Sequence, residues 1–100
     1  DEPISIGELI LDPSKHLLQH NNKTISVGPT EFKLLNFLMK NPDRVFSRNQ
    51  ILDKIWGNKS DIDDRTVDVH IKRLRDSLKI TGQESMIKTV RGIGYRLSKE

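Results

Sequence analysis

The stretch that decides the fold is DRTVDVHIKRLRDSLK, residues 64–79. On a helical wheel at about 100° per residue, its large aliphatic side chains fall within an arc of about 60°: Val67, Ile71, Leu74 and Leu78. The opposite face carries a mostly polar set: Arg65, Thr66, Val69, Lys72, Arg73 and Asp76. Three further polar residues flank the apolar stripe: Asp68, His70 and Arg75. The pattern predicts a helix with one face in a core and the other in solvent.

Local ion pairing does not account for every cation on the outer face of this helix. The opposite-charge pairs at i, i+4 are Asp68–Lys72 and Lys72–Asp76, and both use the same lysine. Val69 stands among these polar residues, and a single exposed valine is ordinary. Surrounded by Thr and Arg, however, it is the residue type that contacts a thymine methyl group in a major groove.

Upstream of this helix the chain predicts a small antiparallel sheet followed by two helices. Brief apolar or alternating runs separated by turn residues predict four strands, at 4–6, 9–11, 17–19 and 24–27. Pro29 at a first helical position and an apolar stripe ending before Pro42 predict a helix over 29–40. A capping box from Ser47 to Gln50 predicts a short helix over 47–56.

Downstream, residues 86–97 predict a hairpin with Arg91 and Gly92 at a tight, glycine-rich tip. Such a tip brings the backbone close to a phosphate or a narrow minor groove. A short helix, a loop, a long basic helix and this hairpin together predict an α+β winged helix-turn-helix fold. Its parts are an N-terminal four-stranded antiparallel sheet, three helices and a C-terminal β-hairpin wing.

Charge points to a polyanionic partner. The chain of 100 residues has 17 Lys and Arg against 14 Asp and Glu, and the excess lies in residues 51–100. Between residues 65 and 96 the count is eight basic against three acidic. A solvated charged surface is the alternative reading of such a run, and the arrangement on helix and tip favours a nucleic acid.

Composition excludes several other classes. The chain has no cysteine, which excludes disulfides and thiolate metal sites and suits a reducing, cytoplasmic location. No apolar run approaches the roughly 20 residues of a membrane span. The acidic residues 61–64 lack the spacing of a calcium loop, and His16 and His20 have no third partner, so we expect no metal or other cofactor. No enzyme motif with its companions is present, and a winged helix that binds only protein remains the alternative function.

Four linked motifs resemble the OmpR/PhoB-type response-regulator output domain. They are residues 28–35 (GPTEFKLL), 44–48 with 55–57 (RVFSR and IWG), 64–75 (DRTVDVHIKRLR) and 89–96 (TVRGIGYR). The resemblance covers essentially the whole chain. The run 64–71 is most similar to the activators of phosphate-starvation genes. The chain is therefore expected to be a fragment of a longer regulator, residues 1–100 lying behind a phosphorylatable receiver domain that a sensor kinase controls.

The resemblance also implies roles for single residues. Base contacts would come from Thr66, Asp68, Val69 and Arg73. Phosphate contacts would come from Arg65, His70, Lys72 and Arg75. Arg91 and Gly92 would enter the minor groove. Two such domains would bind a direct-repeat operator on double-stranded DNA as a head-to-tail dimer. A loop would contact the sigma subunit of RNA polymerase through Trp56, Gly57, Ile62 and Asp64.

Some positions depart from the family pattern or allow a structural role instead. Lys72 stands where arginine is usual, Ile93 replaces a threonine at the wing tip, and the loop 58–61 differs in composition. Trp56 suits a partly buried anchor at a helix end as well as a partner contact. His70 suits a packed structural histidine, and Arg75 suits an ion pair with an acid elsewhere in the fold.

Overall fold

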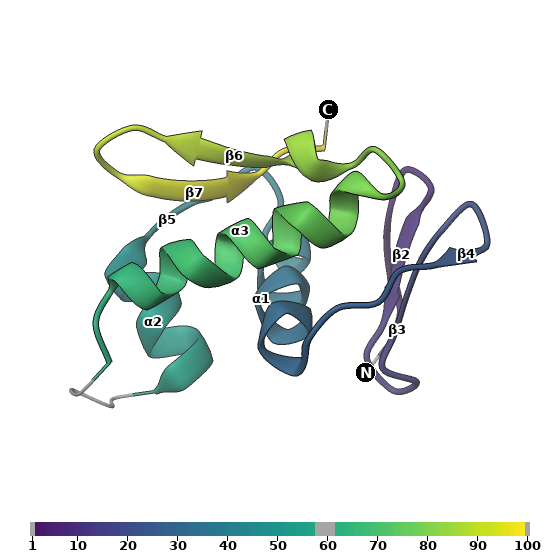
Figure 1. The fold of residues 1–100 in the computed structure, drawn as a ribbon, viewed down its shortest axis with the longest axis horizontal. Helices are drawn as coiled ribbons and strands as arrows, with labels where there is room; N and C mark the ends of the chain where they lie inside the picture. Colours follow the sequence, from purple (N-terminus) through teal and green to yellow (C-terminus); the bar gives the residue numbers. More distant parts are fainter. Residues whose placement is uncertain (1, 58–61, 100) are drawn as a thin grey trace.

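The computed structural model describes residues 2–57 and 62–99 of the chain (Figure 1). Its elements are β1 (Ile4–Ile6), β2 (Leu9–Asp12), β3 (Leu17–His20), β4 (Lys23–Thr24), α1 (Pro29–Lys40), β5 (Val45–Ser47), α2 (Arg48–Trp56), α3 (Arg65–Lys79), the 3₁₀ turn η1 (Glu84–Met86), β6 (Ile87–Val90) and β7 (Gly94–Leu97). The predicted order of sheet, three helices and hairpin is confirmed.

Two antiparallel sheets enclose the helices. The first has the order β1-β2-β3-β4 and lies at one end of the molecule, and the second has the order β5-β7-β6. In Figure 1, α3 crosses in front of α1, and the β6–β7 hairpin runs along α3 above it. The hairpin turn at residues 91–93 projects from the end of the molecule opposite the first sheet.

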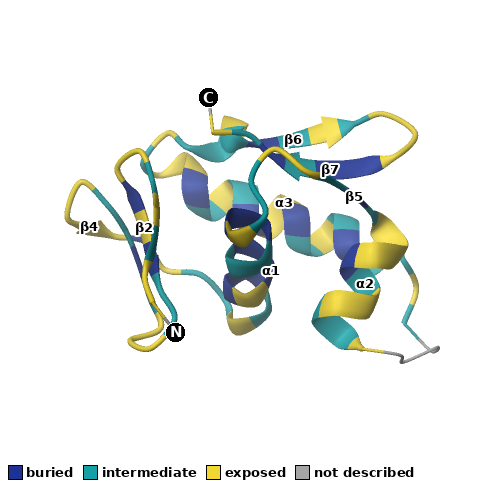
Figure 2. Cartoon of the chain, turned by 180° about the vertical axis from the view of Figure 1, so that it is seen from behind, coloured by how far each residue is buried: buried dark blue, intermediate teal, exposed yellow. Residues whose placement is uncertain are grey.

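The core lies between α3, α1 and the inner faces of both sheets. On α3 the predicted apolar stripe is confirmed, because each member is 1% exposed or less: Val67, Ile71, Leu74 and Leu78. On α1 the matching stripe is also buried: Phe32, Leu35, Leu38 and Met39. Figure 2 shows buried segments alternating with exposed ones along α1 and α3.

Local signals place the helix boundaries. Pro29 is the first residue of α1, and the helix ends at Lys40 with Asn41 as its C-cap, before Pro42. At α2 the predicted capping box is present, since the Ser47 hydroxyl accepts from the Gln50 N–H at 3.1 Å and the Gln50 side chain accepts from the Ser47 N–H at 2.8 Å. These reciprocal bonds satisfy backbone donors that would otherwise be unpaired at the helix start.

Two strands differ from the prediction. The fourth strand was predicted over 24–27, but β4 comprises only Lys23–Thr24, and beyond it the Ile25 N–H donates to Leu18 O at 2.8 Å. The strand β5 was not predicted: Val45–Ser47 pairs with β7 in the register Val45↔Arg96. Three residues carry too little alternation to indicate a strand, and the partner strand lies near the other end of the chain.

The pairing of β5 with β7 makes Gly94 a sensitive position. A Cβ atom on Gly94 would lie 1.9 Å from the Phe46 carbonyl oxygen and 2.9 Å from the Ser47 Cα, both backbone atoms of β5. Gly94→Ala is therefore expected to lower the free energy of unfolding by about 1–3 kcal/mol, measured by urea denaturation. The exposed neighbour Ile93 is the control, and Ile93→Ala should change stability by less than about 0.5 kcal/mol. Equal stability of the two variants would contradict the close approach.

Candidate nucleic-acid interface

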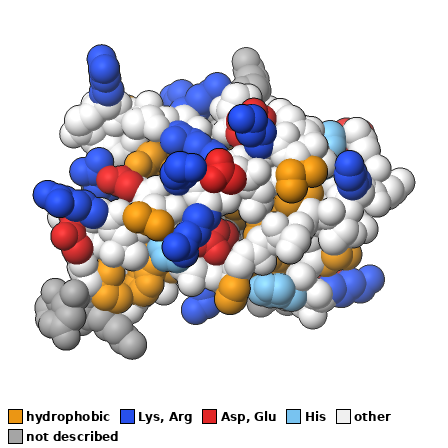
Figure 3. Space-filling model, viewed as in Figure 1, with side chains coloured by type: hydrophobic (Ala, Val, Ile, Leu, Met, Phe, Trp, Pro, Cys, Tyr) orange, Lys and Arg blue, Asp and Glu red, His pale blue; other side chains and the backbone are white. Residues whose placement is uncertain are grey.

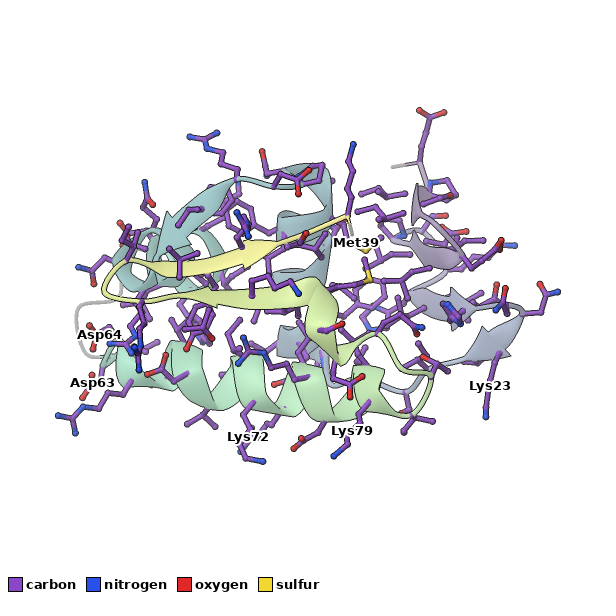
Figure 4. The ribbon with its side chains drawn as sticks, turned by 90° about the horizontal axis from the view of Figure 1, so that it is seen from above. Lys23, Met39, Asp63, Asp64, Lys72 and Lys79 are labelled. Atoms are coloured by element: carbon purple, nitrogen blue, oxygen red, sulfur yellow. The ribbon has the colours of Figure 1, made fainter. Side chains whose placement is uncertain are left out.

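The outer face of α3 is open to solvent along its length. Arg65, Lys72 and Arg73 are exposed, Thr66 is half-buried, and Val69 is 48% exposed. Figure 3 shows Lys and Arg side chains spread over this side of the molecule with acidic and apolar groups between them. In Figure 4 the side chains of Lys72 and Lys79 point from α3 away from the rest of the molecule.

The cations of this face differ in their partners. Lys72 donates to Asp76 at 3.1 Å, and both side chains are largely exposed, so the pair contributes little to stability. Asp68 does not pair with Lys72, contrary to the spacing-based prediction. The Asp63 carboxylate accepts from the backbone N–H of Arg65 at 3.0 Å. Within residues 2–57 and 62–99, the side chains of Arg65 and Arg73 nevertheless form no ion pair. Their guanidinium groups are free to bind an external anion or base edge.

Asp68 is held by two other elements. Its Oδ1 atom accepts from Arg48 Nε at 3.0 Å, at the start of α2, and from the Tyr95 hydroxyl on β7. The carboxylate raises the pKa of Arg48, and burial, followed by the hydrogen bond to Asp68, raises the pKa of Tyr95. The predicted base contact therefore also joins α2, α3 and the hairpin.

Arg75 joins α3 to the hairpin. Its guanidinium donates to the Ile87 carbonyl at 3.1 and 2.8 Å and to the Thr89 hydroxyl at 2.8 Å, and it lies 5.7 Å from the centre of the Tyr95 ring. The alternative of an acidic partner elsewhere in the fold is wrong: the partners are a carbonyl and a hydroxyl. A phosphate contact from Arg75 stays a prediction, and it would use the remaining guanidinium nitrogen.

His70 is packed rather than free. Its Nδ1 atom bonds Glu31, which is 6% exposed on α1, and its ring lies 5.3 Å from the Trp56 ring. The contact joins α1, α3 and the end of α2. A buried carboxylate needs such a partner. The observed contacts of His70 are therefore those of a packed structural histidine. The phosphate contact from His70 stays a prediction that depends on its second ring nitrogen.

The wing tip is exposed at Arg91, Gly92 and Ile93. Gly92 has φ +75°, a left-handed conformation in which a glycine carries no penalty. A cleft of about 280 Å³ separates this hairpin from the starts of α2 and α3. Its walls include Arg48, Thr89 and Tyr95. Sequence reasoning gave no role to Arg48 or Tyr95, because their shared partner Asp68 is distant in sequence from both.

The residues predicted to contact the sigma subunit lie before and after residues 58–61. Trp56 is the half-buried last residue of α2, Gly57 is exposed, and Ile62 and Asp64 are half-buried before α3. The compositional departure at 58–61 lies outside the described residues.

In the part of the chain that is described, no helix has the length and apolar content to cross a membrane. The same part contains no group of three His, Cys, Asp or Glu side chains placed to hold a metal ion.

The fold and this surface define a winged-helix protein of the transcription-regulator class. A family described as "Transcriptional regulatory protein, C terminal" matches residues 21–97. The chain belongs to this family, that of the OmpR/PhoB-type DNA-binding output domains of response regulators. It is a family of DNA-binding regulators rather than of enzymes.

Curated relatives agree with the family. The chain is 50% identical over 98 residues to the phosphate regulon transcriptional regulatory protein PhoB of Klebsiella pneumoniae, covering 98% of this chain and 43% of that protein. It is 48% identical over 94 residues to the heme response regulator HssR of Staphylococcus aureus, covering 94% of this chain and 42% of that protein. The chain thus spans less than half the length of these relatives.

Solved structures agree with the fold. The DNA-binding domain of Klebsiella pneumoniae RstA, in complex with the RstA box, matches with a TM-score of 0.87 and 29% identity, with full coverage of both chains. The AdeR DNA-binding domain, in complex with an intercistronic region, matches with a TM-score of 0.82 and 32% identity, covering 91% of this chain and 94% of that one. Both similar domains were solved with nucleic acid.

The Asp68–Tyr95 contact has a consequence for stability at high pH. Because the pKa of Tyr95 is raised above its ordinary value of 10.0, folding favours the protonated phenol. That contribution is complete below about pH 10 and is lost as the pH rises through the folded-state pKa. Tyr95→Phe should cost about 1 kcal/mol at neutral pH and give a shallower loss of stability above pH 10 than the wild type shows.

Tyr95 is the chain's single tyrosine, so the near-ultraviolet absorbance of tyrosinate follows this one group. Titration of the folded and the urea-unfolded chain measures both pKa values directly. A folded-state pKa equal to or below that of the unfolded chain would contradict the contact.

Proposed function

We propose that this domain reads a specific double-stranded DNA sequence with α3 in the major groove and the wing in the minor groove. The observation that carries the proposal is the row of Arg65, Val69 and Arg73 on the outer face of α3, where neither guanidinium forms an ion pair in the described chain. An arginine can donate two parallel hydrogen bonds to guanine, and a valine suits the thymine methyl group.

The proposed base contacts are Thr66, Asp68, Val69 and Arg73. Asp68 would use Oδ2, because Oδ1 accepts from Arg48 and Tyr95. The proposed phosphate contacts are Arg65, His70, Lys72 and Arg75, and the exposed pair Arg65 and Lys72 can reach a phosphate without losing a buried contact. Arg91 and Gly92 would occupy the minor groove.

The proposal extends to the assembly. Two copies would bind a direct-repeat operator head to tail, with their readers about one helical turn apart. An upstream receiver domain, phosphorylated by a sensor kinase, would promote that dimer. Trp56, Gly57, Ile62 and Asp64 would contact the sigma subunit of RNA polymerase and so activate transcription. The similarity to PhoB supports phosphate-starvation genes as targets, although the similar identity to HssR shows that this level of identity spans regulators of different signals.

Two substitutions on α3 distinguish base contacts, which give sequence specificity, from phosphate contacts, which do not. The operator is first selected from random duplexes, and affinities are then measured by gel shift at two salt concentrations. Arg73→Ala should reduce discrimination between operator and scrambled DNA by roughly 1–3 kcal/mol. Lys72→Ala should weaken both DNAs alike and lower the salt slope by about 0.9.

Lys79→Ala is the matched control, since Lys79 is an exposed cation at the end of the same helix with no proposed contact. An Arg73→Ala variant that loses the same affinity for operator and scrambled DNA would remove Arg73 from the base-reading set. The absence of any DNA binding at low salt would overturn the proposal as a whole.

The sigma contact is tested separately. Ile62→Ala should lower activated transcription in a purified polymerase assay, because it removes an apolar side chain from the proposed contact, while operator affinity stays unchanged. Arg73→Ala, assayed in parallel, should lower both together. If Ile62→Ala activates fully while it occupies the operator, Ile62 has no part in polymerase contact.

A further inference from the structure

A second basic surface lies on the opposite side of the domain from α3. An open groove of about 440 Å³ is formed by α1, α2, β5 and the segment between α1 and β5. No residue of α3 or of the β6–β7 hairpin lines it. Figures 1 and 2 view the molecule from opposite sides, and α1 lies behind α3 in the first and in front of it in the second. DNA bound to the outer face of α3 would leave this groove open.

The groove has a cationic rim and an apolar floor. Its rim carries four exposed cations and no carboxylate: Lys33, Lys40, Arg44 and Lys54. None of the four forms an ion pair within residues 2–57 and 62–99. The floor contains Phe37, Phe46 and Ile55, and the two phenylalanine rings lie 4.5 Å apart. A surface with these properties attracts a chain that is both acidic and partly apolar.

We propose that this groove binds an acidic polypeptide segment carrying one aromatic or aliphatic side chain. Lys33 and Lys40 are seven residues apart on α1, which is about 10 Å along a helix at roughly 1.5 Å per residue. Three residues of extended peptide span that length at about 3.3 Å each. A strand-like acidic segment of three or more residues therefore spans the distance between the two lysines, whereas a single small anion reaches only one of them.

The aromatic floor favours a peptide over single-stranded nucleic acid. Base stacking needs an open ring face. Phe46 is 5% exposed, and Arg44 lies 5.1 Å from its ring centre, while Lys54 lies 6.0 Å from that of Phe37. A cation therefore lies near each ring and Phe46 is almost fully buried, so the floor suits contact with a single inserted side chain better than base stacking.

Asn36 adds a polar point to the same groove. Its side-chain oxygen is buried and has no hydrogen-bond partner in the described chain, which is an unfavourable state for a buried acceptor. Turning this carboxamide outward would let it accept from a backbone N–H of the bound segment.

The test is a titration of the 100-residue chain with a synthetic peptide in which one phenylalanine is flanked by several glutamates and aspartates. Amide chemical shifts should change along α1 and at the end of α2, around Lys33, Lys40 and Lys54, and not along the outer face of α3. Replacing the peptide's phenylalanine by alanine should weaken binding, because the apolar floor then loses its contact. The domain should bind the peptide with equal affinity when operator DNA is already bound.

The variant Lys40→Glu with Arg44→Glu should weaken peptide binding about tenfold or more. The matched control is Lys15→Glu with Lys23→Glu, which changes the net charge equally at exposed positions of the N-terminal sheet region. Equal weakening in both variants means attraction by net charge alone and overturns the proposal. So does displacement of the peptide by single-stranded DNA, or an absence of binding at low salt. Apart from the measurement with bound operator DNA, these readouts do not require the domain to recognise a DNA sequence, so the two proposals fail separately.

Discussion

Burial of one side of α3 is the interaction on which the rest of the structure depends. Val67, Ile71, Leu74 and Leu78 are 1% exposed or less, and burying each large aliphatic side chain contributes about 1.5–3 kcal/mol. Successive residues of a helix are separated by about 100°, so placing this stripe in the core also aims the opposite face at solvent. Exposed ion pairs such as Lys72–Asp76 contribute about 0–1 kcal/mol and cannot reorient the helix. The presentation of the reading face is therefore a consequence of packing.

A second layer of polar contacts sets how α3 lies against its neighbours. Asp68 holds Arg48 and Tyr95, and Arg75 holds the backbone of β6. His70 bonds the buried Glu31 on α1. Asp68, His70 and Arg75 lie on α3 beside the apolar stripe. From there they contact neighbouring elements of the domain and remain near the solvent, where a ligand would bind. DNA bound to α3 would consequently meet a helix whose angle to the wing and to α2 is already fixed.

Much of the fold was predictable because its signals are local. The capping box formed by Ser47 and Gln50 marks the start of α2, and Pro42 marks the end of α1. Each signal lies within a few residues of the boundary that it defines. The strand β5 escaped prediction because three residues carry no readable period and become a strand only beside β7. The site divides in the same way: the outward direction of Arg73 and Val69 follows from the helical period, whereas the partners of Asp68 and Arg75 do not.

The sequence by itself determined the order of first sheet, three helices and hairpin, the two faces of α3, and the glycine-rich tip with Arg91, since each of these signals lies within a short stretch of chain. Only the tertiary structure decided that Asp68 accepts a hydrogen bond from Tyr95 and that Glu31 is buried against His70. It also gathered Lys33, Lys40, Arg44 and Lys54 into one groove, although the first fifty residues have balanced charge. A charge count sums along the chain, but electrostatic attraction depends on distance in space, and that distance is set by how α1 and α2 pack against the core.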